Sequence, residues 1–433
     1  MASSVASLRG EMNRAPRNAL PLLAAVLAVG GCAGGDTTKT TPVIVSVPEG
    51  NTIAVPADQP TIQAGVDAAR PGDLVLVSPG VYRESVNVTT DRIVIRGLDR
   101  DHVVLDGGFK LSDGLFVTAD AVAIENLTIR RYLNNGLIFN GAEQPDGTVD
   151  PNASPTQGWR GSYITAHNNG LYGVYAFQAQ NGRFDHIYAS GHGDSGIYIG
   201  QCKPCNGLVT DSVAEANTIG YEGTNSSKVT LINSVYRRNR VGITSNSQDR
   251  ERVAPSQDVT IAGNLVVDND NPKSPTGEGA FGYGIAIGGS ERVTVLRNRV
   301  VGNDGPGIVI TDLSGFAPSA SRVAGNVVER NGTDLALYGS TGATVGANGS
   351  CFTGNRFTTS FPLKIEATLA CGANAGTVTG RPSLPKEPPG VSFKDVPAPG
   401  PQPNMPDAAT APTEVAVGLP APIDLSSVKV PPR

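Results

Sequence analysis

A short motif recurs through the middle of the chain and constrains the fold more than any other feature. In each copy a polar marker residue precedes a short apolar strand, and the markers are Asn126, Ser162, Asp185, Asp211, Asn233, Asn264, Asn298, Asn326 and Asn355. Most copies lie about 22 to 36 residues apart, a spacing that is typical of solenoids. Asn and Asp tolerate the left-handed backbone that tight corners require. The repeat therefore predicts stacked coils of short strands.

A second signature follows about nine residues after most of these markers. Here a glycine opens a run in which apolar residues alternate, and the glycines are Gly136, Gly173, Gly196, Gly220, Gly242, Gly284 and Gly307. We call these runs Gly-strands. Alternate residues of a strand point to opposite faces, so stacked coils would form parallel sheets around an apolar interior. With 53 Gly and 32 Pro and few aromatic residues, the composition also favours strands and turns over helices.

The two ends of this solenoid have a different character. Residues 60–69 predict a short helix capped by Thr61, with Ile62, Val66 and Ala69 on one face, and such a helix would cover the end of the first coil. Strands are predicted at residues 85–88, 92–96 and 102–105. We assign residues 60–380 to the solenoid. The Pro/Ala-rich tail, residues 381–433, is predicted to be mostly disordered, although it could instead lie along the solenoid in extended form.

The first residues predict export. Three arginines precede an apolar run at residues 20–29, which is too short to span a bilayer and is typical of a secretory signal. Small residues lead directly to Cys32, a pattern that resembles a bacterial lipoprotein signal, with residues 1–31 removed, a lipid on Cys32 and residues 32–59 as a tether. An ordinary signal peptide with an incidental cysteine is the alternative. We expect an extracytoplasmic protein anchored to a membrane.

Four cysteines remain after Cys32, an even number that favours disulfides in an exported protein. Neighbour pairing predicts the bonds Cys202–Cys205 and Cys351–Cys371. A thioredoxin-like role for the first pair would need a cysteine at a helix N-terminus, whereas this pair follows a strand. A bond that stiffens the loop is therefore favoured.

The repeat between about residues 60 and 357 resembles the right-handed parallel β-helix of the pectin-lyase-like superfamily, in its parallel β-helix repeat group. The resemblance implies an all-β solenoid. It implies no single reaction, because this scaffold carries lyases, epimerases, hydrolases, esterases and adhesins. The Arg-Pro-Trp triplet of pectin methylesterases and the Asp-Pro-His-Asp motif of alginate epimerases are both missing.

Long segments between strands predict a binding trough on the Gly-strand face. Residues 141–159, 202–206, 247–256 and 311–319 follow Gly-strands, whereas residues 271–280 precede one, so loops should border both edges of this face. The outward row is predicted to be Tyr175, Tyr198, Glu222 and Thr244. Catalytic candidates are His192, Asp194 and Glu222, and candidates for binding substrate are Tyr172, Tyr175, Tyr198, Gln201, Asn225 and Arg240. Each also has a structural alternative, as a corner residue or in packing between coils.

Aromatic faces among carboxylates and amides suit a polysaccharide. The lead hypothesis is a protein that binds or processes a polysaccharide, and an enzyme of this kind would be a lyase, C5-epimerase or glycoside hydrolase. The alternatives are a non-catalytic structural or adhesive protein and, on the strength of His167, His186 and His192, a copper-accessory-type β-helix protein.

No cofactor is predicted, although the Asp-Asn-Asp-Asn run at residues 268–271 could hold Ca²⁺. The net charge of −5 argues against a nucleic-acid partner, and we expect a monomer.

Overall fold

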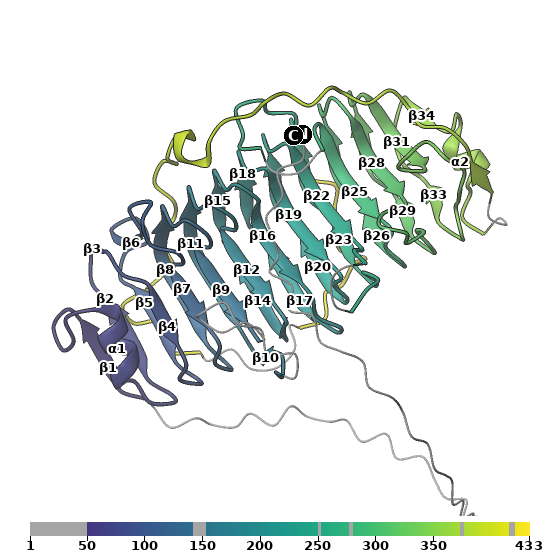
Figure 1. The fold of residues 1–433 in the computed structure, drawn as a ribbon. Helices are drawn as coiled ribbons and strands as arrows, with labels where there is room; N and C mark the ends of the chain where they lie inside the picture. The colour runs from purple at the N-terminus through teal and green to yellow at the C-terminus, as the bar shows by residue number, and fades with distance from the viewer. Residues whose placement is uncertain (1–49, 142–152, 250–252, 277–279, 373–375, 415–420) are drawn as a thin grey trace, which may run out of the picture. The chain divides into compact units, whose positions relative to one another are not determined.

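Short strands form the three faces of a parallel β-helix, as the repeat predicted (Figure 1). This computed structural model describes residues 50–141, 153–249, 253–276, 280–372, 376–414 and 421–433. The predicted signal peptide and Cys32 lie outside the described residues. Within each face, strands from successive coils pair in parallel. Among the described residues, no helix has the length and hydropathy needed to cross a membrane.

The Gly-strands form one face, an eleven-stranded sheet that we call the Gly-strand face. In spatial order it contains β4 (Val86–Val88), β7 (Leu115–Val117), β9 (Leu137–Asn140), β12 (Val174–Phe177), β16 (Ser195–Gly200), β19 (Ile219–Thr224), β22 (Val241–Asn246), β25 (Tyr283–Gly288), β28 (Pro306–Thr311), β31 (Thr333–Tyr338) and β34 (Ser360–Phe361).

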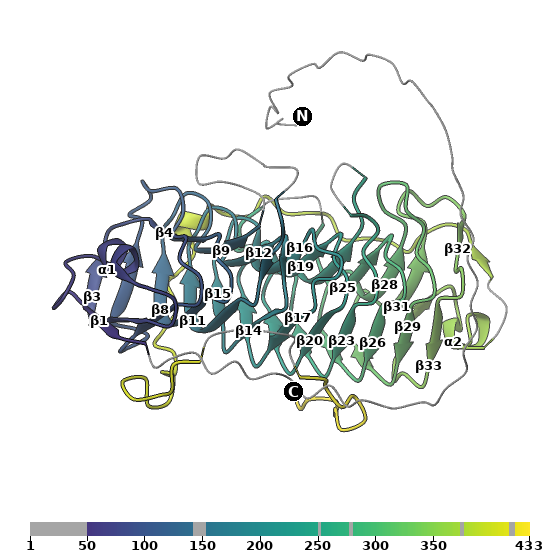
Figure 2. The same cartoon turned by 90° about the horizontal axis from the view of Figure 1, so that it is seen from below.

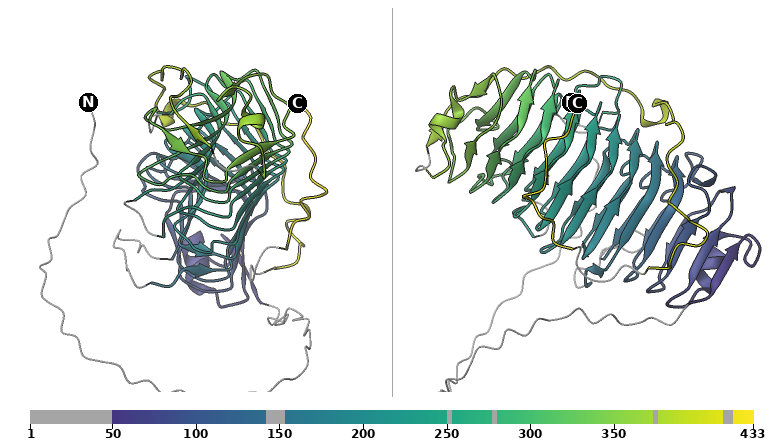
Figure 3. Two further views of the ribbon diagram at one scale, coloured as in Figure 1. Left: turned by 90° about the vertical axis from the view of Figure 1, so that its right-hand side faces the viewer. Right: turned by 180° about the vertical axis from the view of Figure 1, so that it is seen from behind.

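Two further faces complete the coils, and Figure 3 (left) shows them end on. The first face contains β1 (Thr52–Val55), β2 (Leu74–Val77), β5 (Val94–Gly97), β8 (Ala123–Arg130), β11 (Arg160–His167), β14 (Gly182–Asp185), β17 (Gly207–Thr210), β20 (Val229–Ile232), β23 (Thr260–Ala262), β26 (Thr294–Leu296), β29 (Arg322–Ala324) and β33 (Cys351–Thr353). The second face shares β8 and β11 and adds β3 (Gly80–Tyr82), β6 (Val103–Asp106), β15 (Tyr188–Ser190), β18 (Val213–Glu215), β21 (Val235–Arg237), β24 (Leu265–Val267), β27 (Arg299–Val301) and β30 (Val327–Glu329).

Small elements close the ends and corners of the stack. Helix α1 (Ile62–Ala68) begins behind Thr61, whose hydroxyl accepts from the Ala64 N–H at 3.0 Å, and it buries Ile62 and Val66, as predicted. The remaining elements are α2 (Ile365–Thr368), the 3-10 helix η1 (Phe393–Asp395), the pair β10 (Thr156–Gln157) and β13 (Ala179–Gln180), and the pair β32 (Val345–Gly346) and β35 (Thr377–Val378). Both predicted disulfides, Cys202–Cys205 and Cys351–Cys371, are present.

Buried polar ladders run along the inside of two corners. On one of them, Asn264 accepts the N–H of Ser234, and Asn298 in turn accepts the N–H of Asn264 at 2.9 Å. Each ladder side chain thus satisfies a backbone N–H that the corner would otherwise bury without a partner. The repeat alignment was one residue off in earlier coils, where Ser212 and Ser234 hold the ladder positions. The aligned markers Asp211 and Asn233 are instead the preceding corner residues, with φ values of 50° and 52°.

The prediction of a disordered C-terminal tail is wrong for the part that the structure describes. Residues 381–414 and 421–433 lie against the β-helix in extended form. The first part follows one edge of the stack from β34 back toward β6 (Figure 1), and the last part lies on another side (Figures 2 and 3). The tail is therefore a strap on the β-helix.

Arginine side chains of the β-helix hold this strap by donating to its backbone carbonyl groups. The pairs are Arg96 with Ala411 (2.8 Å), Arg100 with Pro403 (3.0 Å), Arg240 with Pro388 (2.6 Å), Arg297 with Val428 (3.0 Å) and Arg299 with Pro431 (2.7 Å). Proline has no N–H to donate to a sheet, but a proline-rich chain keeps its carbonyl acceptors, and each guanidinium offers five donors. Arginine therefore holds a chain that cannot add a regular strand.

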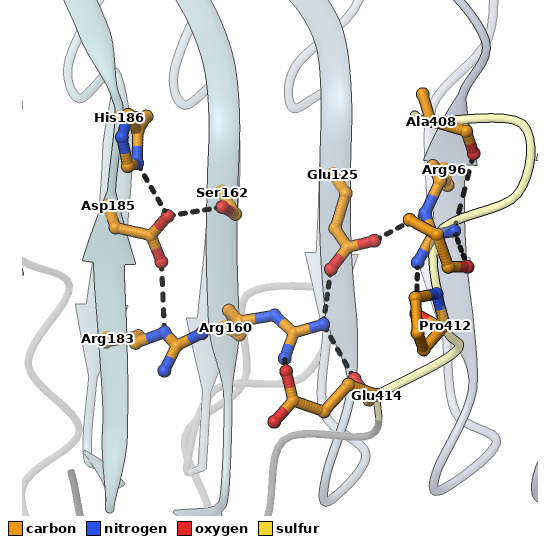
Figure 4. A network of polar contacts seen from close by, with 11 residues as sticks. Arg96, Glu125, Arg160, Ser162, Arg183, Asp185, His186, Ala408, Pro412 and Glu414 are labelled. Carbon is orange, nitrogen blue, oxygen red and sulfur yellow. Dashed lines mark hydrogen bonds and ion pairs between the residues drawn. The ribbon is translucent and has the colours of Figure 1, made fainter. Parts of the chain in front are cut away.

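Figure 4 shows the best connected of these anchors. Arg96 is fully buried, donates to Glu125 at 2.7 Å and to the Pro412 carbonyl at 3.0 Å, and so joins two adjacent strands to the strap. Arg160 contacts the same Glu125 carboxylate and also binds Glu414 at 3.2 Å. Each buried charge in this group has an opposite charge or a hydrogen-bond partner, which is the condition for burying it.

Candidate functional site

The register of the Gly-strand face places the predicted outward row in line. Tyr175 pairs with Tyr198, Tyr198 with Glu222, and Glu222 with Thr244 on consecutive strands. The alternate residues Val174, Ile197 and Ile243 are fully buried in the interior, as predicted. Beyond Thr244 the row continues with Ala286, Val309 and Ala336, where Leu384 of the strap packs on it. The polar part of the row therefore ends where the strap begins to cover it.

Three tyrosines at this row form a compact group, which we call the tyrosine cluster. The rings of Tyr172 and Tyr175 are stacked with their centroids 4.4 Å apart. Tyr198 lies at an angle to both, at 4.7 Å from Tyr175 and 5.2 Å from Tyr172. Tyr172 and Tyr175 are partly exposed, whereas only 4% of Tyr198 is exposed. Tyr198 therefore mainly supports the other two rings.

Two of the predicted catalytic residues, Asp194 and Glu222, meet beside this cluster. Asp194 lies at the corner that leads into β16, and Glu222 projects from β19 in the next coil. The Ser195 hydroxyl lies 2.9 Å from Asp194 Oδ1 and 2.9 Å from Glu222 Oε2. Thr224 donates to the other oxygen of Glu222 at 3.2 Å. The two carboxyl groups are thus held together as one unit, the Asp194–Glu222 pair.

The environment of the pair favours one shared proton. Burial, followed by the charge of Asp194, raises the pKa of Glu222 well above its usual value, and a hydrogen bond between the two side chains raises this pKa as well. Burial together with the charges of Asp194 and Glu222 likewise raises the pKa of Tyr172. Two close carboxylates cannot both ionise freely, so the pair favours a state in which one proton lies between them.

A pocket of about 140 Å³ opens over these groups and is lined by Tyr172, Asp194, Tyr198, Thr218, Ile219, Glu222, Thr224 and Gln248. Gln248 belongs to the loop that follows β22, and Thr218 lies at the opposite edge of the face, where its hydroxyl donates to the Pro275 carbonyl. Side chains from both edges thus line the pocket, and of the loops predicted to border a trough only residues 247–256 contribute to the lining that is described, through Gln248. Sequence reasoning missed Ser195, Thr218, Thr224 and Gln248. Only Thr224 had a signal, because it lies two residues after Glu222 on the same face of the strand.

His192 is not at this site, and its prediction as a general base is wrong. It is fully buried in a corner ladder, where neighbouring coils carry Asn169 and Asn217. Its Nδ1 accepts from the Asn169 N–H at 3.3 Å, and its Nε2 faces the Ala166 carbonyl at 3.2 Å. Burial lowers the pKa of His192 to about 3. The ring replaces a ladder asparagine and remains neutral.

Three predicted binding residues also have other roles. Arg240 is fully buried under the strap, where it binds Glu387 at 2.9 Å and packs on Phe281. Asn225 is fully buried and pins the backbone of Gln248 through both ends of its amide. Gln201 is 3% exposed at a corner and is not among the residues that line the pocket. Their polar side chains looked available only because the strap and loops could not be placed from the sequence.

The metal hypotheses gain no support. Within the described ranges, no group of three or more His, Cys, Asp and Glu side chains is arranged to hold a metal ion. His167 contacts Asn168, and His186 bonds to Asp185 at 3.0 Å and stacks on Tyr163. At the proposed Ca²⁺ run, burial and the charges of Asp304 and Asp268 raise the pKa of Asp270 to about 6.

The fold resembles several solved structures. They include the mannuronan C-5 epimerase AlgE4 A-module of Azotobacter vinelandii, at 15% identity and a TM-score of 0.47, covering 69% of this chain and 91% of that one. An alginate lyase from Paenibacillus sp. str. FPU-7 is 14% identical with a TM-score of 0.40, covering 67% and 98%. Pectate lyase Pel9A is 14% identical with a TM-score of 0.40, covering 72% and 78%.

The activities in these three names are properties of those proteins, and at 14–15% identity the similarity concerns the fold alone. A search of curated proteins finds no match to this sequence. The family model described as "Right handed beta helix region" matches residues 153–316 and 244–377. Because these two matches together cover residues 153–377, just over half of the 433 residues, the chain belongs to the right-handed β-helix family.

Proposed function

We propose that this protein binds a polysaccharide on the Gly-strand face, with the tyrosine cluster as its stacking platform. The observation that carries the proposal is the pair of partly exposed, stacked rings of Tyr172 and Tyr175 beside a pocket lined by carboxyl, hydroxyl and amide groups. Sugar rings present C–H faces that pack on aromatic rings and hydroxyls that need both donors and acceptors. The pocket is smaller than a typical site for a whole small molecule, so it would hold one part of a longer chain.

Replacing Tyr172 by alanine should weaken this binding at least tenfold. The substitution removes one ring of the stack and opens the pocket wall, which should cost roughly 1.5 kcal/mol of ring contact. The measurement is affinity electrophoresis of the purified protein against a panel of soluble polysaccharides. The matched control is Tyr163→Ala, which removes another partly exposed tyrosine, on the first face, where it stacks on His186.

Wild-type protein that binds no member of the panel, or equal binding by the two variants, would refute the proposal. The first result would favour the alternative of a structural surface protein. Thermal unfolding of both variants separates lost contact from lost fold.

Export and lipid anchoring form a second part of this proposal. Support comes from the two disulfides, which are typical of oxidising compartments outside the cytoplasm, and from the signal pattern that ends at Cys32. Mass spectrometry of the mature protein should find Cys32 as the first residue with a diacylglyceryl group on its sulfur. An unmodified cysteine, or a Cys32→Ala protein that stays in the membrane fraction, would contradict anchoring through this residue.

A further inference from the structure

The Asp194–Glu222 pair is built in a way that simple sugar binding does not require. Both carboxyl groups lie at the pocket, and Glu222 is only 9% exposed. A ligand hydroxyl could be bound by one carboxylate or by amides at the surface, whereas two carboxyl groups in contact bring like charges together. The serine between them has a single proton, so its hydroxyl can donate to only one of the two carboxyl groups at a time. The arrangement favours one carboxylic acid beside one carboxylate.

The chemistry of the lining restricts the substrate. Among its described residues are two carboxyl groups and no Lys, Arg or His. The two cationic candidates from the sequence are elsewhere, since Arg240 is bound by the strap and His192 is buried in its ladder. A lyase or epimerase must neutralise the carboxylate of a uronate before C5 loses its proton. The charge of Asp194 would repel that group, so the lining favours a neutral sugar.

The closeness of the pair indicates how the bond would be cleaved. Each contacting oxygen is 2.9 Å from Ser195 Oγ, so these oxygens cannot be farther apart than twice that distance, and the two side chains also share a hydrogen bond. Inverting glycosidases separate their carboxyl groups by about 6.5–9.5 Å to admit a water, whereas retaining ones hold them about 5–5.5 Å apart. Asp194 and Glu222 are therefore too close for the inverting arrangement, and of the two mechanisms only the retaining one needs no water between the carboxyl groups.

We propose that the protein hydrolyses a glycosidic bond of a neutral polysaccharide with retention of configuration, using Asp194 as the nucleophile and Glu222 as the acid and base. This inference rests on the proposed function, because the same pocket must first bind the chain. Asp194 is the more exposed of the two at the corner, and Glu222 is the more buried, which suits the roles of nucleophile and proton donor. Ser195 and Thr224 are positioning residues, since their hydroxyls hold the carboxyl groups.

The reaction balances with water as the only co-reactant. First, the Asp194 carboxylate bonds to the anomeric carbon, the bond from that carbon to the leaving oxygen breaks, and Glu222 gives its proton to that oxygen. Water then attacks the anomeric carbon, the Glu222 carboxylate takes a proton from this water, and the bond to Asp194 breaks. One water is consumed, one glycosidic bond is cleaved, and both carboxyl groups return to their starting state.

The test measures new reducing ends with soluble polymers of glucose, mannose, galactose and N-acetylglucosamine, and with alginate and polygalacturonate as uronate polymers. At least one neutral polymer should be cleaved, and Asp194→Ala and Glu222→Gln should each lower the rate at least 100-fold. The matched control is Asp67→Asn, which removes an exposed carboxylate on α1 and should leave the rate unchanged. Azide added to Asp194→Ala should restore cleavage and yield a glycosyl azide, a product that a structural role for Asp194 would not give. Thermal unfolding checks that each variant is folded.

Four outcomes would overturn the inference. Unsaturated products from alginate or polygalacturonate, detected by their ultraviolet absorbance, would show a lyase. Inverted product configuration by NMR, or unchanged turnover in both carboxyl variants, would exclude the assigned roles. Binding of a polysaccharide without turnover of any polymer would leave the proposed binding function standing and refute hydrolysis, whereas absence of binding would refute both.

Discussion

Deletion of residues 381–433 should lower the unfolding temperature of the protein by roughly 5–10 °C and increase the binding of a hydrophobic dye. The deletion removes the carbonyl acceptors of five arginines and uncovers two apolar surfaces. One is the row under Leu384, and the other is the patch of Ile232, Ala262 and Leu296 under Val428. Calorimetry and dye fluorescence measure the two effects.

A synthetic peptide of residues 381–433 added to the shortened protein should reverse part of the loss, because the strap binds through contacts that do not need chain continuity. Arg297→Ala should reproduce a smaller effect, about 1–3 kcal/mol, since it removes a charged donor to three strap carbonyls. Arg322→Ala, at an exposed arginine of β29, is its control. An unchanged unfolding temperature after deletion would mean that the strap is not bound in solution.

His192→Asn should make the protein more resistant to acid, with a gain of about 2 kcal/mol at pH 5 relative to its effect at pH 8. Burial holds the pKa of His192 at about 3 in the folded protein, whereas an unfolded histidine has a pKa near its ordinary value of about 6.5. As the pH falls below the unfolded pKa, the unfolded chain binds a proton that the folded chain refuses, so stability declines progressively between these two pH values. Asparagine does not titrate, and it can make the two ladder bonds that the Asn217 amide makes to neighbouring backbone, accepting one N–H and donating to one carbonyl.

Denaturant unfolding at pH 8 and pH 5 measures this difference, and His102→Asn is the control. The side chain of His102 is 73% exposed, so this control makes the same substitution outside the buried ladder. If His192→Asn loses as much stability as the wild type between pH 8 and pH 5, then the ring at this corner is not held neutral. A structural role for His192 also predicts that binding of polysaccharide survives the substitution.

Much of the fold follows from short-range rules that the sequence displays directly. A glycine followed by alternating apolar residues fixes both the strand and its inward face, so the sequence alone predicts the row from Tyr175 to Thr244. The cap at Thr61 and the neighbour disulfides are equally local. The ladder position was missed by one residue in some coils because Asp211 and Asn233 suit a left-handed corner as well as a ladder.

The candidate site was predictable only in part. The spacing of the Gly-strands determined that Asp194 and Glu222 lie in adjacent coils. Whether a polar corner side chain turns inward or outward depends on which backbone groups in the next coil lack partners. The His192 ring turns inward because it bonds to such groups, and it is therefore absent from the pocket. The roles of Arg240 and Asn225 likewise depend on other segments. The strap binds Arg240, and the loop that follows β22 binds Asn225.

By itself, the sequence determined the solenoid, its period, its capping helix and the outward row, because each depends on residues a few positions apart. Only the tertiary structure decided the shared serine between Asp194 and Glu222, the burial of His192 and the docking of the strap. The physical reason is that these features depend on the hydrogen-bond partners available across coils and along the surface. A proline-rich tail carries no pattern of its own, and what orders it is a series of arginines up to about 300 residues away.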